Sequence, residues 1–180
     1  IGGGYLLIVL MHGGAPLLNW FKRSPAYKGS VGLEVSPDGV ALVQLTPSRD
    51  ARPVLDGLTY VPCKDEKQQT EAVIRLVNDN QLKGALCHLV LTPRDYELLL
   101  VDAPQVPKEE LAEAMRWRIK DLIDFPLEQA VVDVCPLPED AYRGRMNMVY
   151  VVVCRQERIR HLVDLVSAAG LCLDSIDITE

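Results

Sequence analysis

Apolar and polar residues alternate in the first third of the chain as expected of a β-hairpin and a third strand. Short runs with β-branched residues cover positions 30–35 and 40–46. Ser-Pro-Asp-Gly at positions 36–39 lies between them and has the residue types of a tight turn. A third run at positions 53–61 includes Gly57, which we expect at a bulge.

The pattern then changes from a period of two residues to a helical period. Between positions 64 and 78, Val73, Leu76 and Val77 fall on one face of a predicted helix. Positions 85–92 follow as a nearly continuous apolar run, which is typical of a strand buried on both faces. The order strand–strand–strand–helix–strand predicts an α/β sheet.

Positions 93–154 predict a separate strand–helix–strand–strand unit. Its strands are expected at 97–102, 130–135 and 146–154, and its helix at 108–123. The expected apolar face of that helix consists of Leu111, Met115, Ile119 and Leu122.

The α/β pattern resumes after this unit. Apolar residues spaced by three or four positions predict a helix that ends at Gly170, and an apolar strand follows at 171–178. We therefore expect a leader or appended segment at 1–29, an α/β subdomain at 30–92 and 155–180, and an inserted unit at 93–154.

Composition indicates an acidic globular protein. The chain has 180 residues, 48% of them hydrophobic, and carries a net charge of −6. Nucleic-acid surfaces need clustered Lys and Arg or many stacking aromatic residues, and aromatic residues are only 6% of this chain. We expect no nucleic-acid partner.

Cysteine and histidine residues show no metal-ligand or disulfide spacing. The five cysteines are widely separated, and His12, His88 and His161 are isolated along the chain. We expect reduced cysteines, a reducing compartment and no metal site.

The first residues are typical of a leader and not of a membrane anchor. The apolar run at 5–11 is much shorter than the roughly 20 residues that span a bilayer. Met11 is the first methionine, and Leu-Leu-Asn-Trp-Phe-Lys-Arg at 17–23 looks like a natural N-terminus, so we expect 1–10 to lie upstream of it. One basic pair predicts only weak contact with an anionic membrane.

Three further segments carry a resemblance to a known family. They are Val-Gly-Leu-Glu-Val-Ser at 31–36, the stretch 102–133 with Asp-Ala-Pro-Gln-Val-Pro and Phe-Pro, and Ala-Gly-Leu-Cys-Leu-Asp-Ser-Ile-Asp at 169–177. These segments resemble the PilM/MshI family, actin-like proteins of type IV and MSHA pilus biogenesis that are related in fold to FtsA. Residues 17–23 look like the leader of MshI proteins in particular.

The resemblance implies the first half of an actin-like, ribonuclease-H-like α/β fold with an inserted SHS2-like strand–helix–strand–strand subdomain. It implies a non-catalytic cytoplasmic scaffold at the inner membrane, within the platform for pilus assembly. The implied partners are platform proteins, including a PilN-like peptide, and a second copy of the chain. Membrane contact would be indirect or through a C-terminal region outside this sequence.

The same resemblance implies an alternative, a nucleotide-binding actin-like ATPase whose nucleotide state switches partner binding. In that fold the first hairpin reads Asp-x-Gly-Ser/Thr, and the corresponding positions here are Glu34, Ser36, Asp38 and Gly39. Pro37 removes a donor N–H and the Gly-Ser/Thr pair is absent, so a plain β-turn is the competing interpretation. We expect no enzymatic activity and no cofactor on this chain. Binding of ATP and Mg²⁺ remains an alternative for the full-length protein only.

A ribonuclease-H-like nuclease is a further alternative, and it needs carboxylates that converge on the central strands. The candidates are Glu34, Asp102, Asp133 and Asp177. Because Asp102 and Asp133 belong to the inserted unit, we expect no convergence with Glu34. The acidic net charge also disfavours this function.

The inserted unit offers two candidate surfaces for a partner. Trp117 lies off the apolar stripe of the predicted helix between Arg116 and Arg118, a pattern typical of partner anchors. The alternative is that Trp117 covers the edge of the inserted sheet. Val151 and Val153 belong to an apolar run that would pair with a partner strand or a second copy if it lies at a sheet edge.

Overall fold

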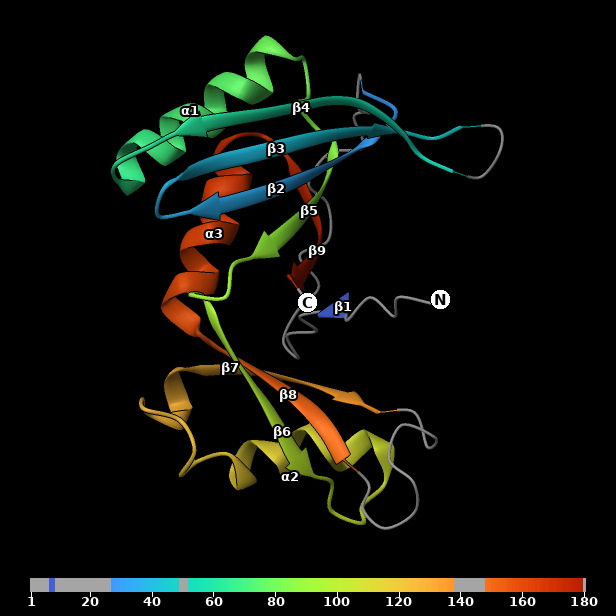
Figure 1. Cartoon of the computed structure of the whole chain (residues 1–180), viewed down its shortest axis with the longest axis vertical. Coiled ribbons are helices and arrows are strands. Elements are labelled where there is room, and N and C mark those ends of the chain that lie inside the picture. The colour runs from blue at the N-terminus through green and yellow to red at the C-terminus, as the bar shows by residue number, and fades with distance from the viewer. Residues whose placement is uncertain (1–6, 9–26, 49–51, 138–147, 180) are drawn as a thin grey trace. The chain divides into compact units, whose positions relative to one another are not determined.

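The computed structural model describes residues 7–8, 27–48, 52–137 and 148–179, which form two compact units. Unit 1 comprises residues 1–92 and 162–180, and unit 2 comprises residues 93–161. Figure 1 shows the larger mixed sheet of unit 1 and the smaller sheet of unit 2. The predicted leader at 17–23 and the predicted loop at 139–145 lie outside the described residues.

Unit 1 is built on a sheet whose strands lie in the order β1-β9-β5-β2-β3-β4. These strands are β1 (Leu7–Ile8), β2 (Ser30–Ser36), β3 (Gly39–Thr46), β4 (Val54–Pro62), β5 (Leu86–Leu91) and β9 (Cys172–Ile178). Antiparallel pairing joins β2, β3 and β4, whereas β5 is parallel to β2 and β9 is parallel to β5. The register shifts beside Gly57, where the bulge is predicted.

Two helices cover one face of this sheet, α1 (Glu66–Asp79) and α3 (Gln156–Ala168). α1 leads from β4 into β5, and α3 leads into β9. The steps from β4 to β5 and from β5 to β9 cross the sheet in the same direction, so right-handed connections place both helices on the same face (Figure 1). Asp65 caps α1 by accepting a hydrogen bond from the Gln68 N–H at 2.8 Å. The strand residues that face the helices are fully buried: Val31, Leu33, Val35, Cys87, Leu89 and Leu91.

The prediction that β5 is buried on both faces is wrong. Cys87, Leu89 and Leu91 are buried, whereas Leu86 is exposed and His88 is half-buried. The reason is that α1 and α3 both pack on the same face, so the alternate residues of β5 point away from them.

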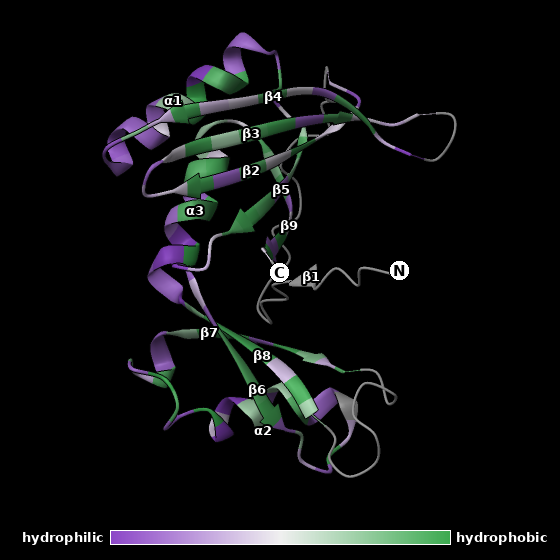
Figure 2. Ribbon diagram, viewed as in Figure 1, coloured by the Kyte–Doolittle hydropathy of each residue, from purple (hydrophilic) through white to green (hydrophobic). Residues whose placement is uncertain are grey.

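Unit 2 is a three-stranded antiparallel sheet in the order β6-β8-β7, with one face packed against α2 (Leu111–Arg118). Its strands are β6 (Tyr96–Asp102), β7 (Ala130–Pro136) and β8 (Met148–Arg155), and Figure 2 shows their largely apolar character. Met115 and Ile119 are fully buried against Val149, Val151 and Val153. The predicted strand–helix–strand–strand order is therefore present.

The α-helix of unit 2 is shorter than the predicted helix at 108–123. Lys108–Glu110 form a 3₁₀ turn, and α2 ends at Arg118. Beyond it, the Ile119 N–H still bonds to Met115, but the Leu122 N–H bonds only three residues back, to Ile119. This tightening rotates Leu122 out of the predicted apolar face, and its side chain is exposed.

The chain leaves unit 2 later than the predicted boundary at residue 155. The division falls between His161 and Leu162, inside α3. Arg158 Nε donates to Asp95 Oδ1 at 2.7 Å, and the Asp95 side chain is only 8% exposed. This ion pair ties the start of α3 to the start of unit 2, which explains the later boundary.

Candidate functional site

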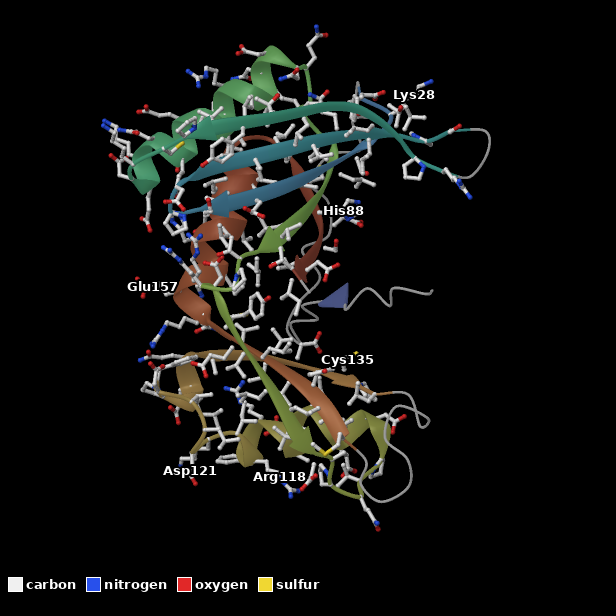
Figure 3. All side chains as sticks on the ribbon, viewed as in Figure 1. Lys28, His88, Arg118, Asp121, Cys135 and Glu157 are labelled. Carbon is white, nitrogen blue, oxygen red and sulfur yellow. The ribbon has the colours of Figure 1, made fainter. Side chains whose placement is uncertain are left out.

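Trp117 lies on the outer surface of α2. Its side chain is 64% exposed, and its Nε1–H donates to Glu113 Oε1 at 3.1 Å, one helical turn earlier. Arg118 and Leu122 are exposed close to it in the chain, and Figure 3 shows Arg118 and Asp121 extending outward from this part of unit 2. Trp117 is therefore off the buried stripe, and this exposure does not fit a residue that covers the sheet edge.

Arg116 does not share this surface, which corrects its assignment to partner binding. Its Nη1 donates to the carbonyl oxygen of Ala130 at 3.1 Å, and its Nη2 donates to that of Leu127 at 2.7 Å. These bonds join α2 to the 3₁₀ turn η2 (Leu127–Gln129) and to the first residue of β7. Arg116 holds unit 2 together, because charge-assisted bonds to backbone carbonyls are stronger than neutral ones.

The hypothesis of an open strand at Val151 and Val153 is wrong. β8 is the central strand of its sheet, with β6 paired on one side and β7 on the other. Both valine side chains are buried beneath α2. The run reads as apolar because it is the core of unit 2, and the sequence pattern does not distinguish a central strand from an edge strand.

The other face of this small sheet carries a carboxyl group among apolar side chains. Asp133 lies between Val132 and Val134, which pack against α2, so its own side chain points to the opposite face. Burial raises the pKa of Asp133, and the Val134 N–H that donates to Oδ1 at 2.8 Å opposes this shift. Leu100, 41% exposed, belongs to the same face. Sequence reasoning singled out Asp133 only as a nuclease candidate.

The candidate nucleotide residues lie at the turn between β2 and β3. Pro37 and Asp38 form a two-residue turn between the paired residues Ser36 and Gly39. Ser36 Oγ donates to Gly39 O at 3.1 Å, and Gln69 Nε2 of α1 donates to Ser36 O at 2.8 Å. The turn is thus held by one hydrogen bond within it and one from α1, which agrees with the β-turn interpretation.

Contacts from β4 and from Cys63, which follows it, fix the same turn on its other side. The Asp38 carbonyl oxygen accepts from the Cys63 N–H at 3.1 Å and from the Tyr60 hydroxyl at 2.9 Å. A side chain at Gly39 would collide with the Val61 carbonyl oxygen and lie 2.7 Å from the Tyr60 hydroxyl. Glycine is therefore required here by the close approach of β4, and nucleotide binding at this turn stays a prediction.

The four carboxylates considered for a nuclease do not come together within either unit. Glu34 and Asp177 both pair with Val90, so β5 separates them, while Asp102 and Asp133 belong to unit 2. Among the residues that the structure describes, no group of three or more His, Cys, Asp and Glu side chains is arranged to hold a metal ion.

His88 has polar neighbours that its isolation in the sequence did not indicate. Its Nδ1 lies 2.8 Å from Ser175 Oγ and 3.6 Å from Asp174 Oδ2 on the adjacent β9. Both groups approach the same ring nitrogen, whereas a catalytic triad needs the hydroxyl and the carboxylate on opposite nitrogens. This group does not form a nucleophilic site. Only the pairing of β5 with β9, which shifts register beside His88, brings these residues together.

Comparison with solved structures shows a similar fold in proteins of pilus and secretion systems. The chain is similar over 83% of its length to a chain of a PilM–PilN type IV pilus biogenesis complex, with a TM-score of 0.69 and 23% identity over 47% of that chain. It is similar over 83% to the cytoplasmic domain of EpsL, an inner-membrane component of the type II secretion system of Vibrio cholerae, with a TM-score of 0.59 and 16% identity over 56% of that chain.

These similarities establish the fold, and the predicted fold class, a partial actin-like α/β fold, is confirmed. A weaker likeness to an actin-like ATPase-fold protein of Bacteroides thetaiotaomicron has a TM-score of 0.44 at 10% identity, over 81% of this chain and 51% of that one, and adds no argument. No protein-family model and no curated protein matches the sequence. The chain spans about half the length of the solved chains, 47% and 56%.

None of the helices in the described part of the chain is both long enough and apolar enough to span a bilayer.

Proposed function

We propose that this chain is part of a cytoplasmic component of the inner-membrane platform that assembles type IV or MSHA pili, and that it acts as a non-catalytic scaffold. The structural likeness to the PilM–PilN complex over 83% of the chain carries the proposal. The likeness to EpsL supports it, because EpsL is an inner-membrane component of a secretion system. The leader at 17–23 and the SHS2-like order of unit 2 favour the MshI type.

The proposed partner is a PilN-like cytoplasmic segment that binds unit 2 at the surface of Trp117, Arg118 and Leu122. An exposed Trp supplies a large and rigid apolar contact, and a neighbouring Arg supplies hydrogen bonds to backbone or carboxylate oxygens of the partner. Because Trp117 already has a partner for its indole N–H in Glu113, its ring can be covered without leaving that donor unsatisfied.

Capture of this chain by an immobilised PilN-like segment tests the proposal. Trp117→Ala is expected to weaken binding by about 2 kcal/mol, roughly thirtyfold, if Trp117 is an anchor of the interface. Leu100→Ala is the matched control, because Leu100 is an exposed apolar residue of unit 2 on the opposite sheet face.

The two variants distinguish the outcomes. Loss of binding in the Leu100 variant with full binding in the Trp117 variant would show that the segment binds the sheet face that carries Asp133. No capture of the wild-type chain by any platform segment would contradict the proposed function itself.

The rival ATPase function predicts tight binding of Mg-ATP by the full-length protein. A nucleotide titration of that protein separates the two, because micromolar affinity would overturn a role as scaffold alone. The turn at Ser36 to Gly39 supports the scaffold in this comparison, since phosphate loops present backbone N–H groups and Pro37 has none.

A further inference from the structure

β4 forms an exposed and weakly protected edge of the unit 1 sheet. Among the described strands it pairs with β3 alone. Its side chains Leu55, Leu58 and Tyr60 are 59%, 67% and 54% exposed. Edge strands are normally protected by charges, by proline or by being short, yet β4 has nine residues, a single charged residue and its only proline at the last position. Such an edge is suited to pairing with another strand.

The one charge of β4, Asp56, lies outside the regular part of the strand and is held by two hydroxyl groups of unit 1. Asp56 Oδ1 accepts from the Thr46 hydroxyl and Asp56 Oδ2 from the Tyr27 hydroxyl, both at 3.2 Å. These bonds hold the carboxylate where the register of β4 against β3 shifts, so the regular part of the strand runs from Gly57 to Val61. That regular stretch is uncharged and has Thr59 at its centre.

We propose that β4 pairs in antiparallel fashion with β4 of a second copy of this chain, around a two-fold axis at Thr59. In this register Leu58 lies opposite Tyr60 of the partner subunit, and Tyr60 lies opposite the partner subunit's Leu58. Both residues point to the sheet face away from the helices, because they pair with Val43 and Ala41 of β3 and not with its buried residues. The dimer therefore contains two identical aromatic–aliphatic cross-strand pairs.

The side of α1 that lies next to β4 favours a second copy of this chain, and not an unrelated strand, as the partner that pairs with β4. Gln68, Glu71, Ala72 and Arg75, at helical spacing, line a cavity of about 390 Å³ together with Val61, Pro62 and Cys63 at the end of β4. This stripe of α1 therefore borders the open edge and would face the corresponding stripe of the second copy.

The charges on that stripe are complementary under a two-fold axis. α1 begins beside the end of β4 and runs back along it, so the level of Thr59, about 10 Å from Pro62, is reached roughly seven residues into the helix. That point lies near Val73, midway between Glu71 and Arg75. The axis thus brings Glu71 opposite Arg75 of the partner subunit and Arg75 opposite the partner's Glu71. This complementarity is independent of the PilN-like partner proposed for unit 2.

Sedimentation of the full chain over a series of concentrations tests the proposal. We expect a reversible dimer, and Leu58→Lys is expected to raise its dissociation constant by roughly tenfold or more, because each interface loses two apolar pairs and gains two edge lysines. Glu71→Arg and Arg75→Glu are each expected to weaken the dimer, whereas an equimolar mixture of these two variants restores it as a heterodimer. Asp79→Lys, at the far end of α1, is the control and leaves association unchanged.

Three results would overturn the proposal. One is a wild-type chain that stays monomeric at every concentration. Another is a dimer that persists unchanged in Leu58→Lys and in Glu71→Arg. The third is association through β4 only when a PilN-like segment is present, which would identify the edge as a site for a partner strand. Circular dichroism of each variant confirms folding, which is expected because Leu58, Glu71 and Arg75 are exposed.

Discussion

Replacing Arg116 by methionine separates a structural role from a binding role in unit 2. Methionine retains much of the aliphatic length of the side chain but removes the bonds from the guanidinium to the carbonyl oxygens of Leu127 and Ala130, at 2.7 Å and 3.1 Å. Arg118→Met is the matched control, because Arg118 lies on the same helix, has the same charge and is exposed. Only the first substitution removes contacts between elements of unit 2.

The expected cost of Arg116→Met is about 2 kcal/mol. A hydrogen bond to a charged group contributes about 1.5–3 kcal/mol, and two such bonds are lost. The sum is reduced because the guanidinium is partly exposed and because Leu127 O keeps the Ala130 N–H as a donor. Arg118→Met is expected to change the unfolding free energy by at most about 0.5 kcal/mol, as surface substitutions usually do.

Urea denaturation followed by circular dichroism measures both variants. A loss of about 2 kcal/mol corresponds to a midpoint roughly 1 M lower for a chain of this size. Equal midpoints for the two variants would refute the structural role of Arg116. Loss of partner capture in Arg116→Met without loss of stability would show that Arg116 takes part in partner binding.

Three further predictions concern burial. Asp133→Asn should remove a pH dependence of stability, because burial raises the pKa of Asp133 in the folded state above its value in the unfolded state. The stability that this group contributes is complete below the unfolded-state pKa and is lost as pH rises through the folded-state pKa. Urea midpoints of wild type and variant across a pH series measure this difference. Met115→Ala should cost about 2–5 kcal/mol by urea denaturation because Met115 is fully buried, and an unchanged midpoint would contradict this core assignment. A thiol reagent should label exposed Cys172 long before Cys87, whose pKa is raised to about 12 by burial. Mass spectrometry of the labelled peptides measures the order, and labelling of Cys87 before Cys172 would contradict the prediction.

Local patterns in the sequence were sufficient for most elements of the fold. The turn at Pro37 and Asp38 has a local cause, because turn residues lie between two short alternating runs. The extent of α2 has a non-local cause, since Leu111 to Leu122 keeps a helical period although the backbone tightens after Arg118. No window of sequence marks that point.

The candidate site was less predictable because residue roles depend on pairing between distant segments. Arg116 and Arg118 look alike in the sequence, and only the bonds from Arg116 to the carbonyl oxygens of Leu127 and Ala130 separate a structural arginine from an exposed one. Pairing through Val151 required its strand to lie at a sheet edge, but β8 is the central strand of its sheet. β4 does lie at an edge, and there Leu58 alternates with half-buried neighbours as in any strand with one covered face. Periodicity indicates which residues share a face and says nothing of what covers it.

The two proposed interfaces lie on different units, and this separation has a consequence for affinity. A dimer through β4 of unit 1 carries two copies of the Trp117 surface of unit 2. If the partner is itself present in several copies, the second contact of such a dimer would form at a high effective concentration once the first is made. Each contact can then be weak and exchange rapidly while the dimer as a whole remains bound. The exposed β4 edge would in this way strengthen a scaffold whose individual contacts are small, without any change in the residues that touch the partner.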